Sequence, residues 1–279
     1  VIEMDKPHLS TYTSSLLTGI ADYALHNSID ISTMFVQSAN KAKTDFLRLM
    51  RERHCDGVIM VFSNTLSSKQ LAKLIDAKMA VMVLNGRCEH PKGGHLYTDP
   101  DAGMSLLLNH LMHLGHRDIA FLAGPQEGDY DNSERVTVFK DHLKAAGNLR
   151  VKQLLAEHQP TRLAQEAGYL QAKDILKRCP DITAMIGNND EMAYGAMLAC
   201  HEAGRRVPTD ISVVGFDDYP GSQYTVPPLT TVRQHLTDVG YQSVEAIHEY
   251  VCGSQKKLPR KVLKPELIVR GSTAAACKS

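Results

Sequence analysis

Short apolar runs alternate along this chain with longer stretches in which apolar and polar residues follow a helical period. The runs are too short for helices and are bounded by Gly, Asp or Asn, which is typical of strands buried on both faces of a parallel sheet. We expect strands at Val1–Met4, Ile31–Val36, Gly57–Phe62, Ala80–Leu84, Ile119–Ala123, Ile182–Ile186 and Ile211–Phe216. The helical stretches between them predict an α/β fold built on doubly wound parallel sheets.

The ends of several helices are marked by the residues that cap them. Asp99 can cap a helix that starts with Pro100 and ends at Gly115, because its carboxylate accepts from free N–H groups and proline suits the first turn. A last helix is expected at about Leu236 to Val251, followed by a short strand at Glu266–Arg270.

Length and charge narrow the possible classes of protein. The 279 residues suggest two domains or one large domain, with Gly93-Gly94 and Pro227-Pro228 as the main loop signals. Lys and Arg total 31, and Asp and Glu also total 31, so the formal net charge is zero. A protein that grips nucleic-acid phosphates normally has a basic excess or a basic face. We therefore expect that this chain by itself does not bind DNA, although a local basic patch stays open as an alternative.

The cysteines and the start of the chain bear on its compartment. None of the six cysteines has C-x-x-C spacing, and a chain of this length needs no disulfides, so single scattered cysteines favour the reducing cytoplasm. No apolar run approaches the ~18 residues of a membrane span. The first residues contain no signal segment and resemble a strand cut partway through, so we expect that a further piece precedes Val1.

Catalytic and cofactor motifs are absent from the sequence. It contains no G-x-S-x-G, no phosphate-binding P-loop, no G-x-G-x-x-G and no H-E-x-x-H. We therefore expect no enzyme activity, no cofactor and no metal. The spacing of His110, His113 and His116 could suit metal ligands, but cations are also favoured near a helix C-terminus, and we prefer this second interpretation.

Two polar groups follow the carboxyl ends of expected strands, where parallel α/β sheets bind ligands, and a third lies at the start of an expected helix. Asn188-Asn189-Asp190 either caps the next helix or turns an amide toward a ligand, and both can hold. Asp217-Asp218 forms either a plain surface turn or an acceptor for sugar hydroxyls or amines. Arg135 lies in a polar loop that opens a helix, where a lone arginine is usually solvated.

Five segments carry motifs that occur together in one family. The first reads LGHRDIAFLAGP, and the others read NDEMAYGA, VPTDISVVGFDD, PPLTTVRQ and ELIVRGST. They occupy residues 114–125, 189–196, 207–218, 227–234 and 266–273. Each motif alone is weak, but in this order and spacing the chain resembles regulators of the lactose-repressor (LacI/GalR) type over nearly its whole length.

The resemblance implies a periplasmic-binding-protein-like fold, in which two doubly wound parallel-sheet subdomains are joined by three crossovers around a cleft. The implied N-terminal subdomain is 1–98 plus 236–266, and the implied C-terminal subdomain is 99–235 plus 267–279. The family also implies a helix-turn-helix headpiece before Val1, which agrees with the cut first strand and the zero net charge.

The same resemblance implies a pocket for a small effector, in which residues of the second subdomain contact the effector. Arg135 takes the place of the family's pocket arginine, and Asp217 that of its ligand-binding acid. Asn189 begins the N-D motif, whose first residue reaches the ligand while Asp190 caps the helix.

The first subdomain is expected to add three residues that contact the effector. Asn85 stands where the family often has an aspartate, so one acceptor is weakened. The first loop departs most from the family, because Ser10-Thr11-Tyr12-Thr13 replaces Asn-Pro-Phe-Phe. Tyr12 can still stack on a ring, while Thr13 makes this side of the pocket more polar.

The implied function is the effector-binding and dimerisation core of a cytoplasmic transcription regulator, a repressor that senses a sugar or sugar derivative. It is expected to be a homodimer, to reach operator DNA through the headpiece and to have no membrane partner. The dimer contact is expected at the helix Ser67–Lys78 and the strand Met79–Leu84, although the apolar stripe of that helix could instead pack on its own sheet.

One function from another class stays open. A periplasmic sugar-binding protein of an ABC transporter would have a similar fold. The unpaired cysteines and the motifs PPLTTV and ELIVRGST argue against this alternative.

Overall fold

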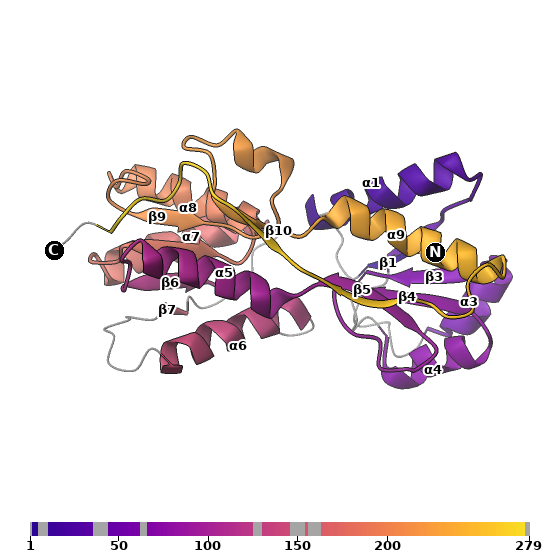
Figure 1. The fold of residues 1–279 in the computed structure, drawn as a ribbon. Helices are drawn as coiled ribbons and strands as arrows, with labels where there is room; N and C mark the ends of the chain where they lie inside the picture. Colours follow the sequence, from indigo (N-terminus) through magenta and orange to yellow (C-terminus); the bar gives the residue numbers. More distant parts are fainter. Residues whose placement is uncertain are drawn as a thin grey trace. The chain divides into compact units, whose positions relative to one another are not determined.

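The computed structural model describes residues 2–4, 11–35, 44–61, 66–124, 130–145, 154–155 and 163–276. The chain divides into two compact units, coloured along the sequence in Figure 1. The first unit consists mainly of Val1–Thr98 and His235–Leu263. The second consists mainly of Asp99–Glu127, Asn132–Gln234 and Lys264–Ser279.

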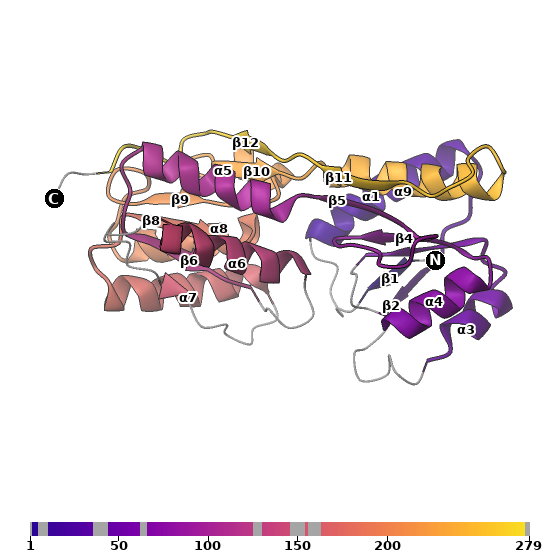
Figure 2. The ribbon, with the colours of Figure 1, turned by 60° about the horizontal axis from the view of Figure 1, so that its bottom comes forward.

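The first unit is a parallel sheet with helices on both faces (Figure 2). Its strands lie in the spatial order β2 (Thr33–Phe35), β1 (Ile2–Met4), β3 (Gly57–Met60), β4 (Ala80–Leu84), β5 (Gly94–Thr98) and β11 (Arg260–Leu263). Apolar side chains of α3 (Phe46–Glu52) and α4 (Ser68–Asp76) form a core with one face of β3 and β4. The helices α1 (Thr11–His26) and α9 (Leu236–Val251) pack against each other, and α9 lies against β3, β4 and β5.

The second unit repeats this arrangement on a smaller sheet. Its parallel strands lie in the order β7 (Leu154–Leu155), β6 (Ile119–Leu122), β8 (Ala184–Gly187) and β9 (Ser212–Val214). Successive side chains of a strand point to opposite faces. Phe121 therefore packs with α5 (Pro100–His113) and α6 (Tyr130–Ala145), while Leu122 packs with α7 (Ala164–Arg178) and α8 (Asp190–Glu202).

Two further strands complete the second unit. The strand β10 (Thr231–Arg233) pairs antiparallel with β12 (Glu266–Ile268), and a short 3-10 helix, η1 (Pro220–Gln223), precedes β10. This pairing joins Arg233 to Glu266, and both residues lie in the second unit, whereas His235 lies in the first. The sequence analysis instead assigns His235 to the C-terminal subdomain and Glu266 to the N-terminal subdomain.

Both sheets share one strand order, which places their ligand-binding edges. In each, the first strand of the unit lies between the second and the third, so the chain reverses direction across the sheet between β1 and β3 and between β6 and β8. Ligands of such sheets bind beyond the carboxyl ends of the strands at this reversal. The predicted α/β class with doubly wound parallel sheets is confirmed.

The predicted elements match the structure where the apolar pattern is strong. The strand Ala80–Leu84 and the helix Leu236–Val251 have the predicted bounds, and Asp99 caps α5 through the N–H groups of Asp101 and Ala102. The strand β5 is not predicted from the sequence, because it begins at Gly94, the second residue of the Gly93-Gly94 loop signal. A Cβ at Gly94 would overlap the sulfur of Met82 and would lie 2.8 Å from the main-chain oxygen of Pro259, which cannot move as a side chain would, so the close packing requires the glycine.

The expected dimer contact through α4 stays a prediction. Its apolar stripe, Leu71, Leu74 and Ile75, is buried in the core of its own unit. The alternative, that this stripe packs on its own sheet, is the one the structure has. Among the described residues, no helix is long and apolar enough to cross a membrane.

Candidate functional site

The candidate site lies at the carboxyl ends of β8 and β9 in the second unit. The N–H of Asp190, which begins α8 after β8, donates to the carbonyl of Phe216 after β9 at 2.8 Å. A Cβ at Gly215 would overlap the carboxylate of Asp190, so the glycine lets the two strand ends approach. These contacts bring the polar residues of both strand ends to one edge of the sheet.

Arg135 places a buried cation at this edge. Only 4 % of the residue is exposed, and its Nη1 donates to the carbonyl of Asn188 at the end of β8. Its guanidinium carbon lies 4.1 Å from the centre of the Phe216 ring, a distance at which a cation is attracted to the ring face. Arg135 lies inside α6 rather than in the loop that the sequence suggested, and it is buried rather than solvated.

Asp217 places a buried carboxylate beside this cation. Its Oδ1 accepts from Nε2 of Gln234 at 2.5 Å, and its carboxylate also hydrogen-bonds the hydroxyl of Tyr219. Burial raises the pKa of Asp217 to about 6, against the lowering effects of the Arg135 charge and of the two hydrogen bonds. The site therefore joins a fixed cation to a carboxylate that ionises near neutral pH.

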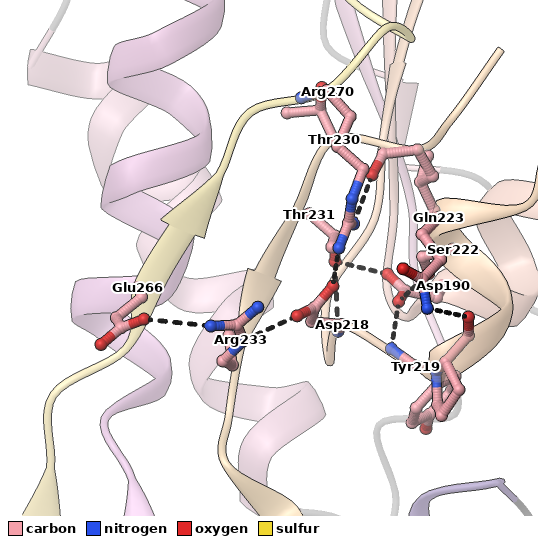
Figure 3. A network of polar contacts seen from close by, with 12 residues as sticks. Asp190, Asp218, Tyr219, Ser222, Gln223, Thr230, Thr231, Arg233, Glu266 and Arg270 are labelled. Carbon is pink, nitrogen blue, oxygen red and sulfur yellow. Dashed lines mark hydrogen bonds and ion pairs between the residues drawn. The ribbon is translucent and has the colours of Figure 1, made fainter.

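A second buried carboxylate, Asp190, holds the turn that carries Asp217 (Figure 3). Its Oδ2 accepts from the N–H of Tyr219 at 2.8 Å and from the hydroxyl of Ser222 at 2.5 Å. Its Oδ1 accepts from the hydroxyl of Thr231 at 2.5 Å. Burial, followed by the charge of Asp217, raises the pKa of Asp190 to about 8.

The helix cap at this edge differs from the one implied by the family. Asn189, and not Asp190, is the N-cap of α8, and its Oδ1 accepts from the N–H of Met192 at 2.9 Å. Asp190 instead faces inward and bonds the turn before β10. The reason is burial, because a fully buried carboxylate needs the donors that this turn supplies.

Asp218 has a structural role next to the site. Its two oxygens accept from Nε of Arg233 at 2.7 Å and from Nη2 of Arg270 at 2.6 Å (Figure 3). Arg233 also forms an ion pair with Glu266 at 3.5 Å. Asp218 therefore ties the turn to β10 and to the segment after β12, which leaves Asp217 as the acid of the pair for a ligand.

The remaining residues that are expected to contact the effector belong to the first unit. Tyr12 and Thr13 lie in the first turn of α1 rather than in a loop, with Thr13 buried and Tyr12 half-buried. Asn85 follows β4 with a φ of 54° and is 4 % exposed. Asn85 thus follows a strand and Tyr12 and Thr13 begin a helix, and all three lie in a different unit from Arg135 and Asp217.

The three histidines are bonded to the protein itself. Nε2 of His110 lies 3.0 Å from the hydroxyl of Thr273, and Nε2 of His116 lies 3.0 Å from the carbonyl of Ala274. Nδ1 of His113 bonds the carbonyl of its own preceding turn. Within the described ranges, no group of three His, Cys, Asp or Glu side chains could hold a metal ion.

Three residues of the site were missed by sequence reasoning. Phe216 ends an expected buried strand and Gln234 ends a recognised motif, but the sequence assigned neither residue a part in the site. Tyr219 carried no signal. Their hydrogen bonds and ring contact follow from the turn between β9 and β10, whose path a linear pattern does not reveal.

The comparisons with known proteins agree with this architecture. The family described as periplasmic binding protein-like domain matches residues 108–273. The HTH-type transcriptional regulator MalR of Streptomyces coelicolor is 32 % identical over 241 residues, which cover 83 % of this chain and 68 % of that protein.

Two solved structures align with almost all of the chain. A dimeric Lac repressor with a C-terminal deletion aligns with a TM-score of 0.84 and 25 % identity over 99 % of both chains. A LacI family transcriptional regulator from Enterococcus faecium with bound ribose aligns with a TM-score of 0.83 and 24 % identity over 98 % of both chains. The likeness therefore extends through both units.

Proposed function

This chain belongs to the LacI/GalR family of transcription regulators, as its effector-binding core, and we propose that it binds a sugar or sugar derivative through Arg135 and Asp217. The observation that carries the proposal is the buried cation beside a buried carboxylate at the edge where such sheets bind ligands. Arginine only donates hydrogen bonds and an ionised carboxylate only accepts them, so vicinal hydroxyls satisfy both. The relative with bound ribose supports a sugar as the effector.

Other residues complete the proposed site. Asn189 keeps its amide N–H groups for the effector, since capping uses only its oxygen. Tyr12, Thr13 and Asn85 are proposed to contact the effector from the first unit. The two units are then the N- and C-terminal subdomains of an effector-binding core, and we propose contact with operator DNA through a helix-turn-helix headpiece, as the name of the HTH-type relative MalR supports.

The second unit also offers a surface for a homodimer. Large apolar side chains are exposed on α7, on α8 and in the turn after η1, where they are Leu163, Leu170, Leu198, Tyr224 and Val226. Val226 is 95 % exposed. We propose that these side chains contribute to a protein interface, since exposed apolar patches mark such interfaces. The dimeric Lac repressor supports a dimer, and we propose that its contact includes this surface beside the one expected at α4 and β4.

The function is regulatory rather than catalytic. MalR and the two structural relatives are named as transcription regulators or repressors, which favours a cytoplasmic regulator over the periplasmic alternative. In this proposal the chain has no enzyme activity and needs no cofactor.

Calorimetric titration with D-ribose, D-glucose, maltose and cellobiose tests the proposal. We expect at least one of these sugars to bind the unmutated chain, and Asp217→Ala to weaken that binding about tenfold to a hundredfold, as the loss of a charged hydrogen bond predicts. Asp174→Ala removes a half-exposed carboxylate on α7 and serves as the matched control. Equal binding by folded Asp217→Ala and the unmutated chain would contradict the assigned pocket.

A further inference from the structure

Tyr219 is bonded to both buried carboxylates of the second unit. Its N–H donates to Oδ2 of Asp190 at 2.8 Å, and its hydroxyl hydrogen-bonds the carboxylate of Asp217. Only 4 % of the residue is exposed, so its ring is enclosed by protein. Figure 3 shows Tyr219 beside Asp190, in the turn that leads to η1.

We propose that Tyr219 is a positioning residue for the effector, because its hydroxyl fixes the orientation of the Asp217 carboxylate while its main chain is held by Asp190. This inference rests on the proposed function, in which Asp217 is an effector ligand. Tyr219 itself is not proposed to touch the sugar.

The geometry of Asp217 shows what the hydroxyl contributes. An ionised carboxylate offers about four acceptor positions. Gln234 and Tyr219 each occupy one of them, and the others stay available for hydroxyl groups of an effector. Two donors from different parts of the chain hold the carboxylate plane, so the effector does not bear the entropic cost of ordering it.

The contacts of Asp190 explain why the hydroxyl of Tyr219 is well placed. Asp190 bonds the N–H of Tyr219, the hydroxyl of Ser222 and the hydroxyl of Thr231, and so fixes both ends of the turn. With its main chain fixed and its ring enclosed, Tyr219 has little freedom to move its hydroxyl. The position of the Asp217 carboxylate thus depends on a network that extends from α8 to β10.

A purely packing role for Tyr219 predicts a different pH behaviour. A hydrogen bond to a carboxylate stabilises its charged form, so removing the donor raises the pKa of that carboxyl group. The charged and titratable groups that act on Asp217 are Arg135 of α6, Asp190 and Glu191 of α8, and Tyr219. Replacing Tyr219 with phenylalanine keeps the ring and the other three groups, and removes only the hydroxyl.

The first experiment measures the pKa of Asp217 without any effector. Carboxyl ¹³C resonances of an aspartate-labelled chain are titrated, and Asp217→Asn assigns the signal. We expect Tyr219→Phe to raise the pKa of Asp217 by about one pH unit, a tenfold change in its protonation equilibrium. Tyr169→Phe is the matched control, because the hydroxyl of Tyr169 bonds the exposed Glu202 at 2.7 Å, outside this network, and it should leave the signal in place.

A second measurement needs no substitution at Tyr219. In the unmutated chain labelled with [ζ-¹³C]tyrosine, the Tyr219 carbon should shift with the midpoint of the Asp217 titration, since the bond joins the two groups. An unchanged Asp217 pKa in folded Tyr219→Phe overturns the proposal. A Tyr219 carbon that does not respond to Asp217 also overturns it.

Measurements of sugar binding distinguish a failure of this inference from a failure of the proposed function. For the sugar that binds best among the four, we expect Tyr219→Phe to weaken binding about tenfold at pH 7 and to move the pH midpoint of binding upward. Wild-type affinity and midpoint in that variant overturn the positioning role. If the unmutated chain binds none of the four sugars, the proposed sugar site fails, and the NMR titration still decides whether Tyr219 holds the Asp217 carboxylate.

Discussion

The guanidinium carbon of Arg135 lies 4.1 Å from the centre of the Phe216 ring, directly before Asp217 in the chain. A helix that precedes β8 in sequence thus delivers a cation to the end of β9. The ring supports one face of the planar guanidinium while Nη1 bonds the carbonyl of Asn188. Orientation, and not charge alone, is therefore what this arginine supplies.

Arg135→Lys tests that orientation. Lysine keeps the positive charge but lacks the planar fork and the stacking on Phe216, so we expect sugar affinity to fall about tenfold or more. Calorimetry with the best-binding sugar measures the change. Arg178→Lys alters an exposed arginine on α7 and should bind normally. Full affinity in Arg135→Lys would show that a point charge is sufficient.

The pH dependence of binding follows from Asp217. Its pKa is raised to about 6 by burial, and only the ionised carboxylate accepts from two hydroxyls. Sugar affinity should therefore be constant above about pH 7 and fall about tenfold for each pH unit below about 5. Titrations between pH 4.5 and pH 8 check this profile. Asp217→Asn should bind weakly at every pH, and a variant that kept the profile would assign it to another group.

Asp190 should make the folded chain less stable as the pH rises. Its pKa is about 8 in the folded protein, above the ordinary 3.8, so between these values the folded state holds a proton that the unfolded state has lost. The free energy of unfolding then falls from about pH 4 to about pH 8 and is constant above. Asp217, with a pKa of about 6, adds to this fall in the free energy of unfolding between about pH 4 and about pH 6.

Urea unfolding of Asp190→Asn and the unmutated chain at pH 5, 6.5 and 8.5 measures this contribution. The variant should lose most of the dependence on pH, since its amide does not titrate. Asp174→Asn, altered on the surface, should keep it. If the free energy of unfolding depends on pH equally in Asp190→Asn and in the unmutated chain, another titrating group causes the dependence.

Gly168 permits the close packing of α7 on α8. A Cβ at this position would overlap the main chain of Met192, which cannot move as a flexible side chain would. Gly168→Ala should destabilise the chain by about 1–3 kcal/mol, the usual cost of overpacking. Thermal melts measure the loss, with the exposed Glu166→Ala on the same helix as the control. A melting temperature equal to that of the control would mean that the helices separate at little cost.

Leu198→Glu tests the proposed dimer surface. Leu198 lies on α8 and is 47 % exposed, so a charge there leaves the fold intact but would be buried in a dimer. Sedimentation should show a dimer for the unmutated chain and a shift toward monomer for the variant. Leu25→Glu, at an 81 % exposed leucine of the first unit, should stay dimeric. A dimer of unchanged stability in Leu198→Glu would place the contact on another surface.

The sequence alone was sufficient for the elements with strong local patterns. Ala80–Leu84 and Leu236–Val251 were predicted with their observed bounds, because a continuous apolar run and a helical period are properties of neighbouring residues. The strand β11 was missed, since Arg260–Leu263 is mostly exposed at a sheet edge and carries no apolar pattern. Pairing with β5, which is distant in sequence, makes it a strand.

The roles of the site residues divide in the same way. The sequence named Asn189 and Asp217 because they follow strand ends, which are local features of the chain, and it named Arg135 only through the resemblance to the family. Only the tertiary structure decided that Asn189 caps α8 while Asp190 faces inward, and that Gln234 and Tyr219 bond Asp217. A hydrogen bond or a raised pKa depends on burial and on partners brought together by the fold, and these are distances in space that no spacing along the chain records.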